Sequence, residues 1–243
     1  MNTRRTFLMS TTAMAIVLLS GCAPTTSILR PFQSPQSEAA RVRAIEQRVN
    51  TILAGTTGAA NRALVGQTAA ARFASMVSHA QPAAVSVDFS IQQITDSPVL
   101  TFAPGAYNPI TVMQGEGRVA AAFLGWVRGT LDALQQEFGS GLRVSATYYG
   151  GADGLPVSAL MYQGEFGMVD IQARYRGTNR RFRIAPGSRI GNPELAVLRA
   201  YGLRTYLHHN SQVPIVDRGY EIETSQQVDS AHRYVRVTIH LSR

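Results

Sequence analysis

The stretch Asn192–Leu207, NPELAVLRAYGLRTYL, predicts an amphipathic helix, and the rest of the chain is interpreted from it. Asn192 is a favourable N-cap, Pro193 suits the first helical position, and Glu194 favours the positive end of the helix dipole. Apolar or small residues then recur at helical spacing: Leu195, Leu198, Gly202, Leu203 and Tyr206. At about 100° per residue, Arg199 falls within that stripe. We therefore expect Arg199 to reach solvent along its own stem, to pair with a carboxylate, or to meet a ligand carboxylate in a pocket.

The segments on either side of this helix alternate between strand and helix patterns. Leu142–Tyr148 alternates as a strand that runs into Gly150-Gly151-Ala152-Asp153-Gly154. Further strands are predicted over Val85–Ile91, near Tyr220–Val228 and over Val235–Leu241, and a helix over Arg118–Phe138 with Trp126 in the core. The order β-α-β-insertion-α-β predicts an α+β fold: a mixed β-sheet with both helices on one face.

The connection between Asp153 and the quoted helix is long. Within about 156–191, Val169–Tyr175 alternates, Arg176–Asn179 is a turn, and Phe182 and Ile184 follow. This pattern predicts an inserted β-hairpin with a basic tip at Arg180, Arg181 and Arg183. The hairpin extends the sheet, covers a pocket, binds a partner or a polyanionic glycan, or is simply solvated, and the sequence leaves these roles open.

The N-terminal part divides into three predicted segments. Residues 1–21 have basic Arg4 and Arg5 and then an apolar run, as in a secretory signal peptide, and 22–36 is a Pro/Ser/Thr-rich flexible tether. Residues 37–81 are expected to form a helical extension, a hairpin whose second helix spans Ala59–His79 after a break at Gly55–Gly58. The main domain is then expected over 82–243.

Leu19-Ser20-Gly21-Cys22 resembles the bacterial lipobox, which implies that Cys22 carries a lipid anchor. Ala23 after it resembles the sorting pattern for the outer membrane, so we expect the protein on the periplasmic face of that membrane. The pair Arg4-Arg5 also resembles a twin-arginine signal, so the export route stays open. Because Cys22 is the only cysteine, a disulfide, a thiolate metal site and a cysteine nucleophile are excluded from the body of the chain.

The chain is basic, with a formal net charge of +8, or about +6 without Arg4 and Arg5. An exported protein does not normally meet nucleic acid, so no nucleic-acid partner is expected. The polyanions of the periplasm are the carboxylates of peptidoglycan and anionic lipid headgroups.

From Val85 to the C-terminus, the chain resembles the OmpA-like (OmpA/MotB C-terminal) peptidoglycan-binding domain. The resemblance rests on a strand ending in Gly-x-x-Asp, a helix of the form Asn-x-x-Leu-x-x-x-Arg-Ala, and an Arg-x-Val strand. The matching residues are Gly150, Asp153, Asn192, Leu195, Arg199, Ala200, Leu203, Leu207, Arg233 and Val235.

The resemblance implies that Asp153 and Arg199 grip the diaminopimelate of the peptidoglycan stem peptide, with help from Asn192. The chemistry agrees, since an Asp/Arg pair complements the ammonium and carboxylate that diaminopimelate carries on one carbon, and arginine can bind a carboxylate through two parallel hydrogen bonds. The loop around Phe102–Asn108 would form another wall. Ala152 and Ala196 depart from the family's usual Thr and Ser, and the inserted hairpin lengthens the Asp-to-Arg connection.

Other site chemistry finds little support in the sequence. His208-His209 lacks further ligands at metal-binding spacing, and neither Gly-x-Ser-x-Gly nor His-Glu-x-x-His occurs. We therefore expect no enzyme, metal or cofactor, but an outer-membrane lipoprotein that binds peptidoglycan non-covalently and tethers membrane to wall. The alternative is a structural lipoprotein subunit of an envelope-spanning secretion or conjugation machine.

Overall fold

The computed structural model describes residues 35–65, 71–81, 84–93, 102–108, 118–157 and 159–242. Ser34–Arg243 forms one compact unit. The predicted signal peptide 1–21, the lipidation site Cys22 and the tether up to residue 34 lie outside the described residues. Among the described helices, none is both long and apolar enough to span a membrane.

The described part of the chain forms a mixed sheet of seven strands in the order β1-β2-β7-β3-β6-β4-β5. The strands are β1 (Ala71–Gln81), β2 (Ala84–Gln93), β3 (Arg143–Ala152), β4 (Val169–Tyr175), β5 (Thr178–Ile184), β6 (Ile215–Thr224) and β7 (Val235–Ser242). Neighbours pair antiparallel except β3–β6 and β6–β4, which are parallel. The carboxyl ends of β3, β6 and β4 therefore meet at one edge of the sheet.

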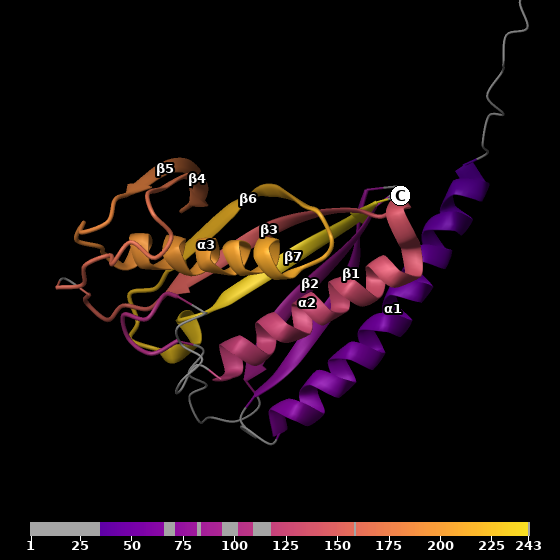
Figure 1. The fold of residues 1–243 in the computed structure, drawn as a ribbon, viewed down its shortest axis with the longest axis horizontal. Coiled ribbons are helices and arrows are strands. Elements are labelled where there is room, and N and C mark those ends of the chain that lie inside the picture. The colour runs from indigo at the N-terminus through magenta and orange to yellow at the C-terminus, as the bar shows by residue number, and fades with distance from the viewer. Residues whose placement is uncertain are drawn as a thin grey trace, which may run out of the picture. The chain divides into compact units, whose positions relative to one another are not determined.

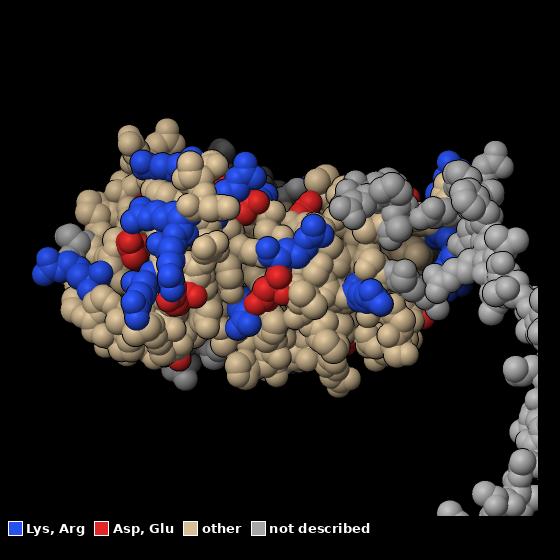
Figure 2. Space-filling model, turned by 90° about the horizontal axis from the view of Figure 1, so that it is seen from above, with Lys and Arg blue, Asp and Glu red and all other residues tan. Residues whose placement is uncertain are grey.

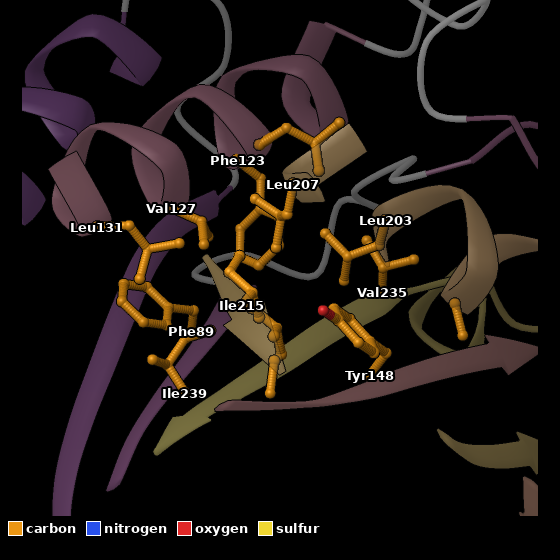
Figure 3. Close-up of a cluster of buried hydrophobic side chains, with 14 of the residues drawn as sticks. Phe89, Phe123, Val127, Leu131, Tyr148, Leu203, Leu207, Ile215, Val235 and Ile239 are labelled. Atoms are coloured by element: carbon orange, nitrogen blue, oxygen red, sulfur yellow. The ribbon is translucent and has the colours of Figure 1, made fainter. Parts of the chain in front are cut away.

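Helices α2 (Arg118–Phe138) and α3 (Asn192–Asn210) lie on one face of this sheet, and α1 (Pro35–Val65) lies beside α2 (Figure 1). The predicted α+β class with helices on one face is thus confirmed. Figure 3 shows the core that forms between them, with Phe123, Val127 and Leu131 from α2, Leu203 and Leu207 from α3, and Phe89, Tyr148, Val235 and Ile239 from the strands. All of these side chains are buried.

Helix α2 has the predicted bounds, and α3 begins where predicted but with a different N-cap. Gly191 is the N-cap residue, with extended backbone, and Asn192 is the first helical residue. The Glu194 carboxylate accepts a hydrogen bond of 3.1 Å from the Gly191 main-chain N–H. This hydrogen bond from the N-cap residue to the third helical residue satisfies one of the main-chain N–H groups that have no partner within the helix. The Asn192 side chain is therefore available for another contact.

The helical hairpin predicted over 37–81 is wrong in its second half. Helix α1 continues through Gly55–Gly58 to Val65, and Ala71–Gln81 is strand β1, paired with β2 along its length. The Thr56 hydroxyl donates to the Ile52 carbonyl within α1 and accepts from Thr130 of α2 at 3.0 Å. Packing against α2 and β1 offsets the cost of two mid-helix glycines, about 1 kcal/mol each.

The Asn61 side chain explains how α1 protects the edge of the sheet. Its amide nitrogen donates to the Phe73 carbonyl at 3.0 Å, and its oxygen accepts from the Phe73 main-chain N–H at 2.6 Å. An Asn side chain thus occupies both polar groups that Phe73 of β1 presents at the sheet edge. The segment predicted as a separate extension is therefore part of the main domain.

The inserted hairpin is confirmed as β4 and β5, joined by a tight turn at Arg176 and Gly177, where both φ angles are positive. Two such residues in succession give the turn whose twist matches that of a hairpin. One of the roles left open by the sequence is observed: β4 pairs with β6, so the hairpin extends the sheet.

Candidate functional site

Helix α3 lies directly against the end of β3, because glycine occupies the contact point. A Cβ atom at Gly150 would lie 2.0 Å from the Ala196 carbonyl oxygen, and one at Gly151 would lie 2.4 Å from the Tyr234 ring. Any side chain at Gly150 would push the helix away from the strand. Gly150 therefore lets α3 approach β3 closely enough for Arg199 to reach the end of that strand, and Gly151 leaves room for Tyr234 on the other side.

Arg199 is completely buried, with 0% of its surface exposed. Its Nε donates to the Ala106 carbonyl at 2.9 Å and its Nη1 to the Gly151 carbonyl at 2.6 Å. The guanidinium carbon lies 4.8 Å from the centre of the Phe102 ring. Among the described residues, no partner accepts a hydrogen bond from Nη2. Of the three environments expected for Arg199, solvent is excluded.

Asp153 is also buried, but its ion-pair partner is Arg233 and not Arg199. The Asp153 Oδ2 lies 3.4 Å from Arg233 Nε, and no group in the described part of the chain donates a hydrogen bond to it. The Asp153 main-chain carbonyl accepts a hydrogen bond of 2.6 Å from the Asn192 side chain. This contact joins the start of α3 to the end of β3, and the predicted ligand-binding role of Asn192 stays a prediction.

Arg233 was a matching residue in the sequence but had no predicted role. Only 8% of the Arg233 surface is exposed, and its Nη1 donates a hydrogen bond of 3.4 Å to the Phe102 carbonyl. Its arginine side chain and its place before a strand were visible in the sequence. The contact of Arg233 with Asp153 was not visible in the sequence, because it requires the turn before β7 to fold back on the end of β3.

The buried cluster of Asp153, Arg199 and Arg233 holds two guanidinium groups and one carboxylate. Burial lowers the pKa of Arg199 to about 9, the Asp153 charge opposes this shift and the Arg233 charge adds to it. Charged groups inside a protein are unfavourable unless paired and hydrogen-bonded. A cluster with an excess cation, a free Nη2 and a carboxylate oxygen without a hydrogen bond is chemically suited to take a further anionic group, together with a donor for Asp153.

Residues 102–108 form a lid over this cluster. Phe102 and Ala106 contact Arg199 as described, and Tyr107 fastens the lid to the segment that precedes β4. The Tyr107 hydroxyl donates to the Glu165 carboxylate, 2.7 and 2.9 Å from its two oxygens, and accepts from the Gln163 main-chain N–H. Burial, and then the Glu165 contact, raise the pKa of Tyr107 to about 12. A ligand that approaches Arg199 from this side therefore has to displace residues 102–108.

An open pocket of about 360 Å³ lies next to the buried cluster, at the shared edge of the parallel strands. Both apolar and polar residues line it: Ala152, Tyr175, Arg176, Ile222, Glu223, Thr224, Ser225, His232 and Tyr234. The Tyr234 hydroxyl donates to the Glu223 carboxylate. Neither Asp153 nor Arg199 lines this pocket.

No family model matches the chain, and no curated protein matches it. Within the described residues, no group of three His, Cys, Asp or Glu side chains is placed to hold a metal ion. His208, a residue considered for metal binding, instead hydrogen-bonds Asp217 at 2.8 Å and Tyr148 at 3.2 Å.

Proposed function

We propose that this protein is a non-enzymatic lipoprotein of the bacterial outer membrane, anchored at Cys22, that binds peptidoglycan through the cluster of Asp153, Arg199 and Arg233. The observation that carries the proposal is the convergence of Asp153 and Arg199 on one buried cluster despite the hairpin inserted between them. Each has one polar atom without a hydrogen-bond partner among the described residues. An amino acid offers the two groups that these atoms lack, a carboxylate for Arg199 and an ammonium for Asp153.

The lid defines how a ligand would enter. Because Arg199 is fully buried, a diaminopimelate carboxylate can reach its free Nη2 only if groups packed against the guanidinium, such as the Phe102 ring, move aside. The Tyr107–Glu165 contact is the link that holds the lid on its outer side. Ligand binding is therefore coupled to opening of residues 102–108, and its rate is expected to be limited by that opening.

The test is co-sedimentation of residues 34–243 with isolated sacculi, with and without free diaminopimelate. We expect diaminopimelate to release the protein and cadaverine, which has the two ammonium groups but no carboxylate, to release much less. This comparison uses the unaltered sequence, so it does not depend on the folding of a variant. Equal release by both compounds, or by neither, contradicts the proposal.

Two variants locate the site within the chain. Arg199→Met removes the cation and keeps most of the volume, and we expect it to reduce the sedimented fraction at least tenfold, about the contribution of one charge-assisted hydrogen bond. Arg204→Met is the matched control on the same helix, since Arg204 pairs with Asp217 and not with the cluster. Circular dichroism confirms that both variants are folded. Equal loss in the two variants contradicts the assignment of Arg199.

A further inference from the structure

Five arginines gather on the hairpin of β4 and β5, far more than its acidic residues can balance. They are Arg174, Arg176, Arg180, Arg181 and Arg183, and all are exposed. The one acidic residue of the two strands, Asp170, is already bound by Arg181 through two hydrogen bonds of 2.7 Å. Figure 2 views the molecule from the side on which the hairpin lies in Figure 1, and basic side chains gather there with fewer acidic ones among them.

The pairing of the two strands places three of these arginines on the same outward face. Arg174 lies opposite Asn179, Arg181 opposite Gln172, and Arg183 opposite Asp170, all at positions that alternate with the buried side of the hairpin. Neighbours on one face of a strand are about 7 Å apart, and paired strands about 5 Å apart. The arginines thus form a flat array and not a closed pocket.

Arg180 pairs with the buried Ala173 and therefore lies on the other face of the hairpin, and it and Arg176 of the turn stack on aromatic rings. Arg180 lies 4.8 Å from the centre of the Phe182 ring and 5.8 Å from that of Tyr175, and Arg176 lies 5.2 Å from the centre of the Tyr175 ring. Stacking of this kind limits how far the long side chains move, which lowers the entropy lost when they bind an anion. The full sequence contains arginine but no lysine, and the planar fork of arginine can bind a phosphate through two hydrogen bonds.

Exposed methionines flank the base of the hairpin. Met168 directly precedes β4 and is 53% exposed, and Met161, bridged to Arg189 just after β5, is 40% exposed. Exposed cations with flexible apolar side chains nearby in the fold are typical of contact with a membrane interface, where the charges meet headgroups and the apolar groups enter the boundary below them. A compact soluble anion would not need the methionines, and it would favour a concave site.

We propose that the hairpin arginine surface, defined as Arg174, Arg181 and Arg183, binds the phosphate headgroups of an anionic lipid membrane, with Arg176 and Arg180 adding to the positive charge of the hairpin. This contact is separate from the ligand of the buried cluster. Charged residues on an edge strand also discourage pairing with other sheets, but that effect carries no preference for one lipid over another. Lipid selectivity is therefore the property to measure.

The experiment measures partitioning of residues 34–243, without an anchor, onto vesicles of phosphatidylglycerol mixed with phosphatidylcholine. We expect binding that is lost on pure phosphatidylcholine and weakens steeply with salt. Arg174→Gln combined with Arg183→Gln is expected to lower the partition coefficient about 30-fold, since each basic residue near an anionic surface contributes about one factor of five. Asp170→Asn, which frees Arg181, is expected to raise it about fivefold.

The matched control carries Arg62→Gln and Arg128→Gln, two exposed arginines on α1 and α2 with the same change in net charge. We expect the control to retain most of the binding. Equal loss in the two double variants, equal binding to neutral vesicles, or binding to sacculi but not to vesicles would overturn the proposal. Arg199→Met is expected to leave vesicle binding unchanged, so failure of the peptidoglycan proposal and failure of this one give different results.

Discussion

Arg199 and Arg181 are both held by two hydrogen bonds, yet their surroundings are opposite. Arg199 is completely buried and donates to main-chain carbonyls, whereas the Arg181 side chain is 68% exposed and donates to the Asp170 carboxylate. Burial lowers the pKa of Arg199, and the hydrogen bond to Asp170 raises that of Arg181. Arginine is thus costly to keep charged at position 199 and easy to keep charged at position 181.

This difference separates what each region can do. A buried cation with an unsatisfied N–H discriminates strongly among ligands, because a poor ligand leaves charges unpaired inside the protein. An exposed array of arginines attracts anions over a distance but discriminates weakly, and salt screens it. We therefore propose the buried cluster for specific recognition and the hairpin for attachment to a charged surface.

The largest expected effect is on the free energy of unfolding of Arg199→Met. The substitution removes the donor to the buried Gly151 carbonyl and to the part-buried Ala106 carbonyl, which costs about 2–4 kcal/mol in spite of the relief of a buried charge. Arg183→Met on the exposed hairpin face is expected to change stability by about 0.5 kcal/mol or less. Denaturant unfolding followed by circular dichroism measures both. Losses of equal size would remove the distinction between the two regions.

The second effect is a difference in pH dependence. Burial lowers the pKa of Arg199 to about 9 in the folded chain, below its ordinary value in the unfolded chain. Between these two values the unfolded chain binds more protons, so the unfolding free energy rises with pH. Burial raises the pKa of Tyr148 and of Tyr220, which acts in the opposite direction. Those tyrosines are present in both proteins, so their effect cancels when wild type and Arg199→Met are compared.

We therefore expect wild type to gain stability relative to Arg199→Met as the pH rises through about 9. Arg181→Met provides the control. The folded-state pKa of Arg181 is raised, so its contribution is lost only above the ordinary pKa of arginine, and the difference between this variant and wild type stays flat over the same range. If the stability difference between wild type and Arg199→Met is also independent of pH, then burial does not lower the pKa of Arg199.

The secondary structure could be predicted from sequence wherever one periodicity dominated. The apolar positions of 118–138 recur at helical spacing and those of β3 and β7 alternate, and each of these elements is present with bounds close to the prediction. The helix predicted over residues 71–81 was wrong. Their alanines favour a helix, whereas pairing with β2 makes them a strand. Such pairing depends on tertiary contacts that local propensity does not contain.

The candidate site was only partly accessible from sequence, for a similar reason. Arg199 was recognisable because a charge on an apolar helical stripe is unusual. Its partners are the Ala106 carbonyl and the Phe102 ring, which lie in a loop far away in the sequence. Likewise, the pairing of Asp153 with Arg233 could not be read from spacing, because the sequence does not contain the path of the loops between strands.

A smaller effect is expected at the lid. Tyr107→Phe removes the hydroxyl that joins residues 102–108 to Glu165, which is expected to lower the unfolding free energy by about 1 kcal/mol. It should also speed hydrogen exchange of the lid amides. Tyr162→Phe is the matched control, because its hydroxyl accepts from the Phe166 main-chain N–H within its own loop. We expect that control to leave exchange of the lid unchanged, and equal acceleration in both variants would show that the Tyr107–Glu165 contact does not hold the lid.

The smallest expected effect concerns salt, and it compares the two ion pairs directly. The Asp170–Arg181 pair is exposed, so the coupling measured by a double-mutant cycle should be small and should vanish as salt rises from about 0.05 to about 0.5 M, where the screening length falls to about 4 Å. Asp153 and Arg233, with 5% and 10% of their side chains exposed, lie where salt ions do not reach. Their coupling should persist at high salt. Persistence of both couplings would mean that the hairpin pair is shielded from solvent in solution, and the exposed surface proposed to bind lipid would then be covered.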